Sequence, residues 1–204
     1  MYLKRDAFAN SECCIFVKKP LLRTIFRKYK SVLLFLGLFF GSYLVLSGLY
    51  GGYLHLSEES AYKPDLITHL VAKQSTAVIR VFEYEAMVAP HPDKPTMKLY
   101  VNGDYLARII EGCNSVSIII LFMAFVIAFA QQWKKTLLYL LTGAVLIYSV
   151  NLIRIAVLAI ALYEYPQHAS WLHGIVFPGL IYGMVFLLWI VWVRQLKPIA
   201  NKHE

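Results

Sequence analysis

Three residues in the second half of the chain carry side chains that suit acyl transfer. Cys113 offers a nucleophile, Arg154 a fixed positive charge, and His173 a group that exchanges protons near neutral pH. In such a reaction the thiolate attacks a carbonyl carbon, the guanidinium stabilises the oxyanion, and the imidazole protonates the leaving amine. The fold must therefore bring together residues that are up to sixty positions apart.

Each of the three residues also has an ordinary structural explanation. A lone Cys near a helix is usually a small buried hydrophobic residue, and a His at a membrane interface is commonly an anchor. Arg154 is harder to explain in this way, because a cation within an apolar helix costs at least about 2–3 kcal/mol on insertion scales. Its long side chain could still reach the nearby headgroups. The chemical interpretation therefore depends on all three residues meeting at one place.

The composition predicts an integral membrane protein. Hydrophobic residues make up 59% of the 204 positions and charged residues only 16%, which is far from the mix of a soluble domain. The apolar residues cluster in four runs, each near the roughly 20 residues that cross a hydrocarbon layer of about 30 Å: 31–54, 114–130, 137–160 and 174–193. Because lipid cannot pair with backbone polar groups, these runs must be helices. We expect an all-α bundle of about four transmembrane helices over residues 31–193.

Lys and Arg flank the runs unevenly, which predicts the orientation. They are concentrated in the juxtamembrane segment 1–30, between the second and third runs, and in the tail 194–204, so both termini should be cytoplasmic. The long connection 55–113 offsets six basic residues with eight acidic ones and should lie outside the inner (plasma) membrane. The net charge of +8 then reflects topology and attraction to membrane lipid, with no nucleic-acid partner.

With this topology, helix geometry places the three reactive residues near the outer face. Cys113 stands at the outer start of the second run, where a helix N-terminus and a nearby cation favour the thiolate. Arg154 lies roughly 27 Å above the cytoplasmic entry of the third run near Thr136, at about 1.5 Å per residue. His173 opens the fourth run from the outside.

Three polar neighbours are candidate substrate-binding residues. Glu111 and Asn114 flank the nucleophile, and Asn151 lies one helical turn before Arg154. Each also has a structural alternative, since Glu111 or Asn114 could cap the helix that begins there and Asn151 could bond a neighbouring helix.

The outer connection should contain two elements of its own. Residues 64–82 predict an amphipathic helix on the membrane or on the bundle, whose apolar positions are Leu66, Leu70, Val71, Val78 and Phe82. Farther on, Asn102-Gly103 between two β-prone runs predicts a hairpin that leads the chain to Cys113.

The three motifs together resemble a known family. The segments EGCNSVSIIILF, NLIRI and WLHG, each at its own span, are similar to the Cys, Arg and His motifs of the exosortase/archaeosortase family. The residues of these motifs and the short chain most resemble the exosortase F type of Bacteroidetes. The resemblance covers roughly residues 100–190. Larger members have about eight spans and often a Cys-Ser-Gly motif, whereas this chain has Cys113-Asn114-Ser115.

The resemblance implies a membrane-embedded cysteine peptidase or transpeptidase that needs no cofactor and no metal. By matching motifs, Cys113 is the nucleophile, Arg154 the cationic stabiliser and His173 the acid/base. The implied substrates are exported proteins with a C-terminal sorting signal, made of a short motif, a hydrophobic helix and a basic tail. A membrane partner subunit in place of the missing helices is a further candidate partner.

Other classes fit the sequence less well. A thiol oxidoreductase needs paired outer thiols, but Cys13 and Cys14 fall in the cytoplasmic segment. The histidines show no tight metal-ligand spacing. The strongest rival is a non-catalytic membrane scaffold or assembly subunit of an envelope sorting system, in which Arg154 pairs with another subunit.

Overall fold

The computed structural model describes residues 29–58, 64–92, 94–130 and 132–195. The predictions for the basic segment before residue 29 and for the tail after residue 195 lie outside these residues. In chain order, the elements are α3 (Lys30–Glu58), α4 (Leu66–Val81), β1 (Ala86–Pro90), β2 (Met97–Val101), β3 (Asp104–Ile109), η1 (Glu111–Cys113), α5 (Val116–Ala128), α6 (Trp133–Glu164), η2 (Pro166–His168), α7 (Ala169–Trp171), η3 (Leu172–Val176) and α8 (Phe177–Gln195). The described chain is thus mostly helical, with one small sheet.

Three of the helical segments are long and apolar enough to cross a membrane: Lys30–Ser57, Trp133–Glu164 and Leu172–Gln195. The second apolar run differs from the prediction, because it forms only the 13-residue helix α5. Such a helix rises about 20 Å, short of the hydrocarbon thickness of about 30 Å. Compared with the predicted run, the helix is two residues shorter at each end: Ser115 has a left-handed backbone (φ 62°) before its start, and Phe129 is its C-cap.

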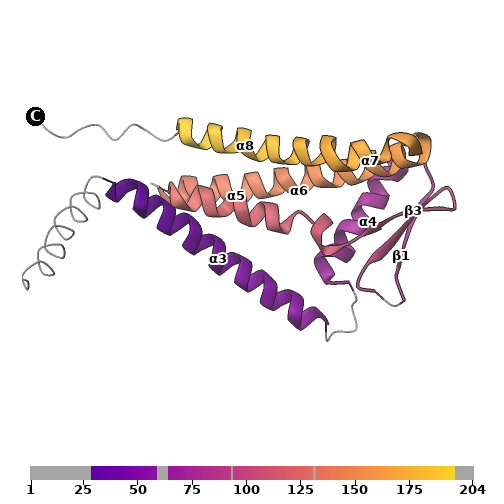
Figure 1. The fold of residues 1–204 in the computed structure, drawn as a ribbon, viewed down its shortest axis with the longest axis horizontal. Helices are drawn as coiled ribbons and strands as arrows, with labels where there is room; N and C mark the ends of the chain where they lie inside the picture. Colours follow the sequence, from indigo (N-terminus) through magenta and orange to yellow (C-terminus); the bar gives the residue numbers. More distant parts are fainter. Residues whose placement is uncertain (1–28, 59–63, 93, 131, 196–204) are drawn as a thin grey trace, which may run out of the picture.

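The helices form a bundle that carries the sheet at one end (Figure 1). Helix α5 packs against α3, α6 and α8, and α6 also packs against α8. Toward the sheet, α3 diverges from α8, and α4 crosses the end of the bundle between α6 and the strands (Figure 1).

Two hydrophobic cores meet along α6. The membrane core joins α5, α6 and α8 around buried side chains: Phe122, Val126, Ile147, Val185 and Trp192. The outer core joins α4, the sheet and the later turns of α6, and its buried members include Ile79, Met97, Leu99, Val101 and Ile155. The short α6 segment between Ile147 and Ile155 therefore belongs to both cores, and it contains Asn151 and Arg154.

The sheet is an antiparallel meander in the order β1, β2, β3. Strands β2 and β3 are joined by Asn102-Gly103, both with positive φ (49° and 88°), as a tight primed turn requires. Strand β1, which the sequence did not predict, pairs with the other edge of β2. Alternate residues of β2 are buried against the outer core, and β3 then delivers the chain to η1 and Cys113.

Helix α4 falls in the predicted segment, and of its predicted apolar positions Val71 is fully buried while Val78 packs against the outer core. Its buried residues are mostly small or polar: Thr68, Val71, Ala72, Ser75, Thr76 and Ile79. Of the predicted apolar face, Leu66, Leu70 and Phe82 are exposed. The small residues allow α4 to lie close to α6, and Tyr148 of α6 donates a hydrogen bond of 2.6 Å to Gln74 of α4.

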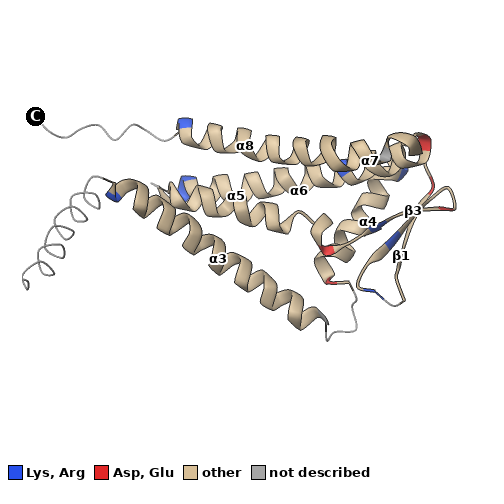
Figure 2. Cartoon of the chain, viewed as in Figure 1, with Lys and Arg blue, Asp and Glu red and all other residues tan. Residues whose placement is uncertain are grey.

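Charged residues separate along the bundle (Figure 2). Among the described residues, Asp and Glu occur in the half that holds the sheet, whereas basic residues begin α3 and α6 and end α8 at the opposite end (Figure 2). The basic residues at this end are among those that flank the apolar runs in the sequence, and the orientation was predicted from them.

Gly143 of α6 offers a test of the membrane core. A Cβ atom at this position would overlap the fully buried ring of Phe122, whereas a Cβ at Gly183 of α8 would meet nothing within 4 Å. We expect Gly143→Ala to destabilise the protein by about 1–3 kcal/mol through overpacking. Gly183→Ala should be neutral or slightly stabilising, because alanine favours the helix. Thermal unfolding in detergent measures both, and equal melting temperatures would contradict the predicted packing of α5 on α6.

Candidate active site

The backbone of Cys113 is held from both sides. The residue ends η1, and its N–H donates a hydrogen bond of 2.8 Å to the carbonyl of Ile110. Its own carbonyl accepts a bond of 2.8 Å from the side-chain amide of Asn151 on α6. The nucleophile candidate is therefore attached to α6 through a buried side chain, although 38 positions separate the two residues.

The side chains of Cys113, Arg154 and His173 all line one cavity of about 560 Å³. Cys113 is a half-buried free thiol, and it shares this cavity with Arg154. The rest of the lining is largely apolar and comes from β2, β3, the segment after β3 and α6: Leu99, Ala107, Ile109, Ile110, Ile155, Leu158, Ala159 and Leu162. The structure thus brings together the three residues that the sequence singled out for acyl-transfer chemistry.

Arg154 has unused hydrogen-bonding capacity. Its Nε is buried and has no hydrogen-bond partner within the described part of the chain. No Asp or Glu is among the described residues that line the cavity. A buried guanidinium without a carboxylate partner is costly, so a group that accepts its hydrogen bonds would be stabilised there.

His173 enters the cavity from a π-helical turn, η3, between α7 and α8. A π turn contains an extra residue and shifts the side chains that follow it, and such turns are common at functional sites. The imidazole is exposed, so it can exchange protons with water as well as with a bound group.

Asn114 and Asn151 are placed differently from the cavity residues. Each is 1% exposed and hydrogen-bonded within the protein, and neither is in the cavity lining. Glu111 is half-buried two residues before Cys113 in η1, and it too is absent from that lining. The geometry favours a role in positioning over direct contact for the two asparagines.

The cavity also contains polar residues that the sequence did not single out. Thr96, Arg108 and Ser170 line it, and the buried Oγ1 of Thr96 has no hydrogen-bond partner among the described residues. Strand pairing of Met97 with Ile109 brings Thr96 near the end of β3, the strand that contains Arg108 and leads to Cys113. Their roles depend on strand register, and the hairpin signal at Asn102-Gly103 alone could not indicate which side chains face the thiol.

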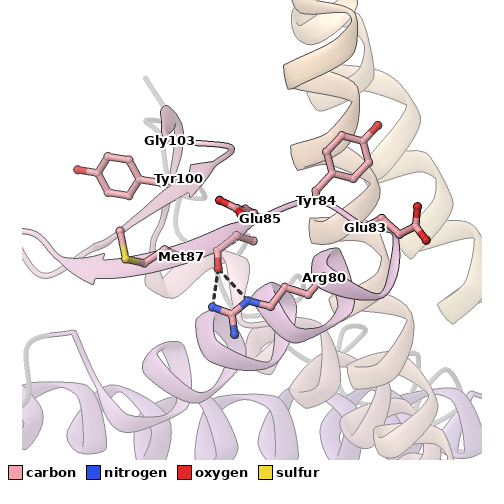
Figure 3. A pocket seen from close by; sticks show the side chains of 8 residues that line it. Arg80, Glu83, Tyr84, Glu85, Met87, Tyr100 and Gly103 are labelled. Carbon is pink, nitrogen blue, oxygen red and sulfur yellow. Dashed lines mark hydrogen bonds between the residues drawn. The ribbon is translucent and has the colours of Figure 1, made fainter.

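A second cavity, of about 590 Å³, lies between the end of α4 and the sheet and offers different chemistry (Figure 3). Its cation, Arg80, donates two hydrogen bonds to the carbonyl of Ala86, at 3.0 and 2.6 Å (Figure 3). Glu83, Glu85 and Tyr84 also line it, but Cys and His do not occur among its described lining residues.

Within the described chain, no group of three or more His, Cys, Asp or Glu is arranged to hold a metal ion. The cavity at Cys113 is therefore the candidate active site.

Comparison with known proteins identifies a family. A family model described as "Transmembrane exosortase" matches residues 29–193, a range that includes the cavity residues and all of the bundle except the last two residues of α8. No curated protein and no solved structure matches the chain.

Because Cys113 and Arg154 line one cavity, labelling of the thiol tests whether the guanidinium acts on it. In a chain lacking Cys13 and Cys14, Arg154→Gln should slow labelling of Cys113 by a membrane-impermeant thiol reagent by about tenfold, because a nearby positive charge stabilises the negative charge on the attacking sulfur. Arg194→Gln, at the far end of α8, is the matched control and should label at the original rate. Equal rates for the two variants would show that Arg154 does not act on the thiol.

Proposed function

Because the chain belongs to the transmembrane exosortase family, we propose that it is a membrane-embedded cysteine peptidase or transpeptidase. Its substrates are exported proteins that carry a C-terminal sorting signal with a hydrophobic helix and a basic tail. It cleaves them at the outer face of the inner membrane through a thioester on Cys113. The observation that supports this proposal is that Cys113, Arg154 and His173 line a single cavity.

The first half-reaction forms the thioester. The Cys113 thiolate attacks the carbonyl carbon of the scissile peptide bond, and the negative charge passes to the carbonyl oxygen. Arg154, which lines the cavity, donates hydrogen bonds to that oxyanion. When the intermediate collapses, the carbon–nitrogen bond breaks and protonated His173 gives its proton to the leaving amine.

The second half-reaction releases the acyl group. Water or an acceptor amine attacks the thioester carbon and passes its proton to neutral His173, and Cys113 leaves as the thiolate. Atoms and charge balance without a cofactor. Water as the acceptor makes the protein a peptidase, and an amine makes it a transpeptidase.

The shape of the cavity supports a membrane-anchored substrate. Leu158 and Leu162 line it from α6, a helix long and apolar enough to cross the membrane, and Leu99 and Ile109 line it from the sheet. A peptide that leaves the lipid beside α6 would pass between these apolar surfaces and present its backbone to Cys113. Orientation with the sheet outside, which the charge separation supports, puts this exit at the outer face.

Replacement of the nucleophile tests the proposal directly. In cells that express Cys113→Ala, exported proteins with a C-terminal hydrophobic helix and basic tail should accumulate uncut in the membrane, because no thioester can form. Quantitative comparison of membrane fractions by mass spectrometry identifies the retained proteins.

The chain supplies a matched control in Cys13→Ala together with Cys14→Ala, which removes the other thiols. This variant should process substrates like the wild type at equal expression. Normal processing by Cys113→Ala would rule out the nucleophile and favour the scaffold hypothesis.

A further inference from the structure

Asn114 joins three helices beside the nucleophile. Its Oδ1 accepts a hydrogen bond of 3.0 Å from the N–H of Val116 at the start of α5. Its Nδ2 donates to the hydroxyl of Tyr50 on α3, at 2.7 Å, and to Oγ1 of Thr68 on α4, at 3.2 Å. These bonds use both amide hydrogens and one oxygen site of a side chain that is 1% exposed. The conformation of the residue next to Cys113 therefore depends on all three helices.

The bond from Asn114 to Tyr50 connects α3 to the residue beside Cys113. None of the apolar stretch that makes α3 a candidate span is buried within the protein. Nearer its start, α3 is attached to α5 through aromatic contacts, with the rings of Phe35 and Phe129 4.5 Å apart. Toward the sheet, α3 diverges from α8 (Figure 1). Tyr50 is in the second half of α3, and the hydrogen bond that its hydroxyl accepts from Asn114 is shorter than the one that Asn114 donates to Thr68.

The backbone at this point is unusual, which makes such support necessary. Ser115, the next residue, holds a left-handed φ of 62°, a conformation that costs energy for a residue with a Cβ. Its side chain is buried and its hydroxyl donates to the carbonyl of Asn114 at 2.6 Å. A strained residue persists only where its surroundings determine it, and Asn114 supplies those surroundings on the side of α3 and α4.

We infer that Tyr50 is a positioning residue: through its hydrogen bond to Asn114, helix α3 sets the position of the Cys113 thiol relative to Arg154 and His173. The inference deepens the proposed function and rests on it for its catalytic consequence. Without the Tyr50 hydroxyl, the Asn114 amide hydrogen is buried without one of its acceptors, and the turn that carries Cys113 can shift. A misplacement of about 1 Å can lower a catalytic rate by as much as about 100-fold, so a measurable loss is expected.

The adjacent tyrosine of the same helix provides a matched control. Tyr53 lies three residues later, and its hydroxyl is buried without a hydrogen-bond partner among the described residues. Tyr50→Phe and Tyr53→Phe thus remove the same atom from the same helix, but only the first breaks the bond to Asn114. Tyr50→Phe should lower kcat for substrate cleavage about tenfold with little change in KM, while Tyr53→Phe keeps both constants.

Two further measurements separate positioning from general loss of stability. Both variants should melt within a few degrees of each other, and Tyr50→Phe should add no further loss in an Asn114→Ala background, because the two residues act through one bond. Equal kinetics for the two tyrosine variants, or additive losses in the double variant, would overturn the inference.

Labelling of Cys113 by a small thiol reagent distinguishes this inference from the proposed function, since it needs no substrate. If Cys113→Ala still processes substrates but Tyr50→Phe alters the labelling rate relative to Tyr53→Phe, the proposed function fails and the positioning role stands. If the labelling rates of the two tyrosine variants match, the positioning role fails, whatever the outcome for Cys113→Ala.

Discussion

The hydrogen bond from Asn151 to the carbonyl of Cys113 is the interaction on which the site geometry depends. Asn151 is on α6, one turn before Arg154, so the same rigid helix holds the backbone of the nucleophile and presents the guanidinium. Within the described chain, the carbonyl of Cys113 does not accept a helical backbone hydrogen bond. Near lipid, where water is scarce, such a carbonyl needs a donor from a side chain, and Asn151 provides it. The amide that meets this need also fixes the thiol in the cavity that contains Arg154, since the separation of two points on one helix hardly varies.

The two hydrophobic cores hold this arrangement from opposite directions. The membrane core fixes α5 and α8 against α6, with Tyr139 donating a bond of 2.6 Å to the carbonyl of Leu188 on α8. The outer core fixes the sheet and α4 against the later turns of α6. The cavity opens beside the outer core, and its walls come from the later turns of α6 and from the sheet. Cys113 and Arg154 are therefore only partly buried and His173 is exposed, so neither core has to enclose these polar groups completely.

The sequence predicted those features that residue chemistry or helix length determines. It predicted less well the features that depend on how side chains pack in three dimensions. Cys113, Arg154 and His173 could be grouped before the structure was known, because a membrane-spanning helix has a fixed rise and one charged residue interrupted the third run. The exact ends of α5 could not be anticipated from hydropathy, since the left-handed backbone at Ser115 depends on neighbours in space. The sequence predicted an amphipathic helix at α4 but did not indicate that its small residues would pack on α6. Thr96 and Arg108 were not predicted to line the cavity, because their position beside Cys113 depends on strand register.

The length of α5 also has a consequence for the surrounding bilayer. A helix of 13 residues beside much longer apolar helices is a case of hydrophobic mismatch. Lipid responds to a short helix by thinning locally, which draws the headgroups toward its ends. The turn that carries Cys113, just before α5, would then lie close to the headgroups at its end of the bundle. For the proposed reaction, the depth at which a substrate emerges from lipid would help to decide which of its peptide bonds reaches Cys113, so membrane thickness would act on the cleavage position alongside the residues themselves.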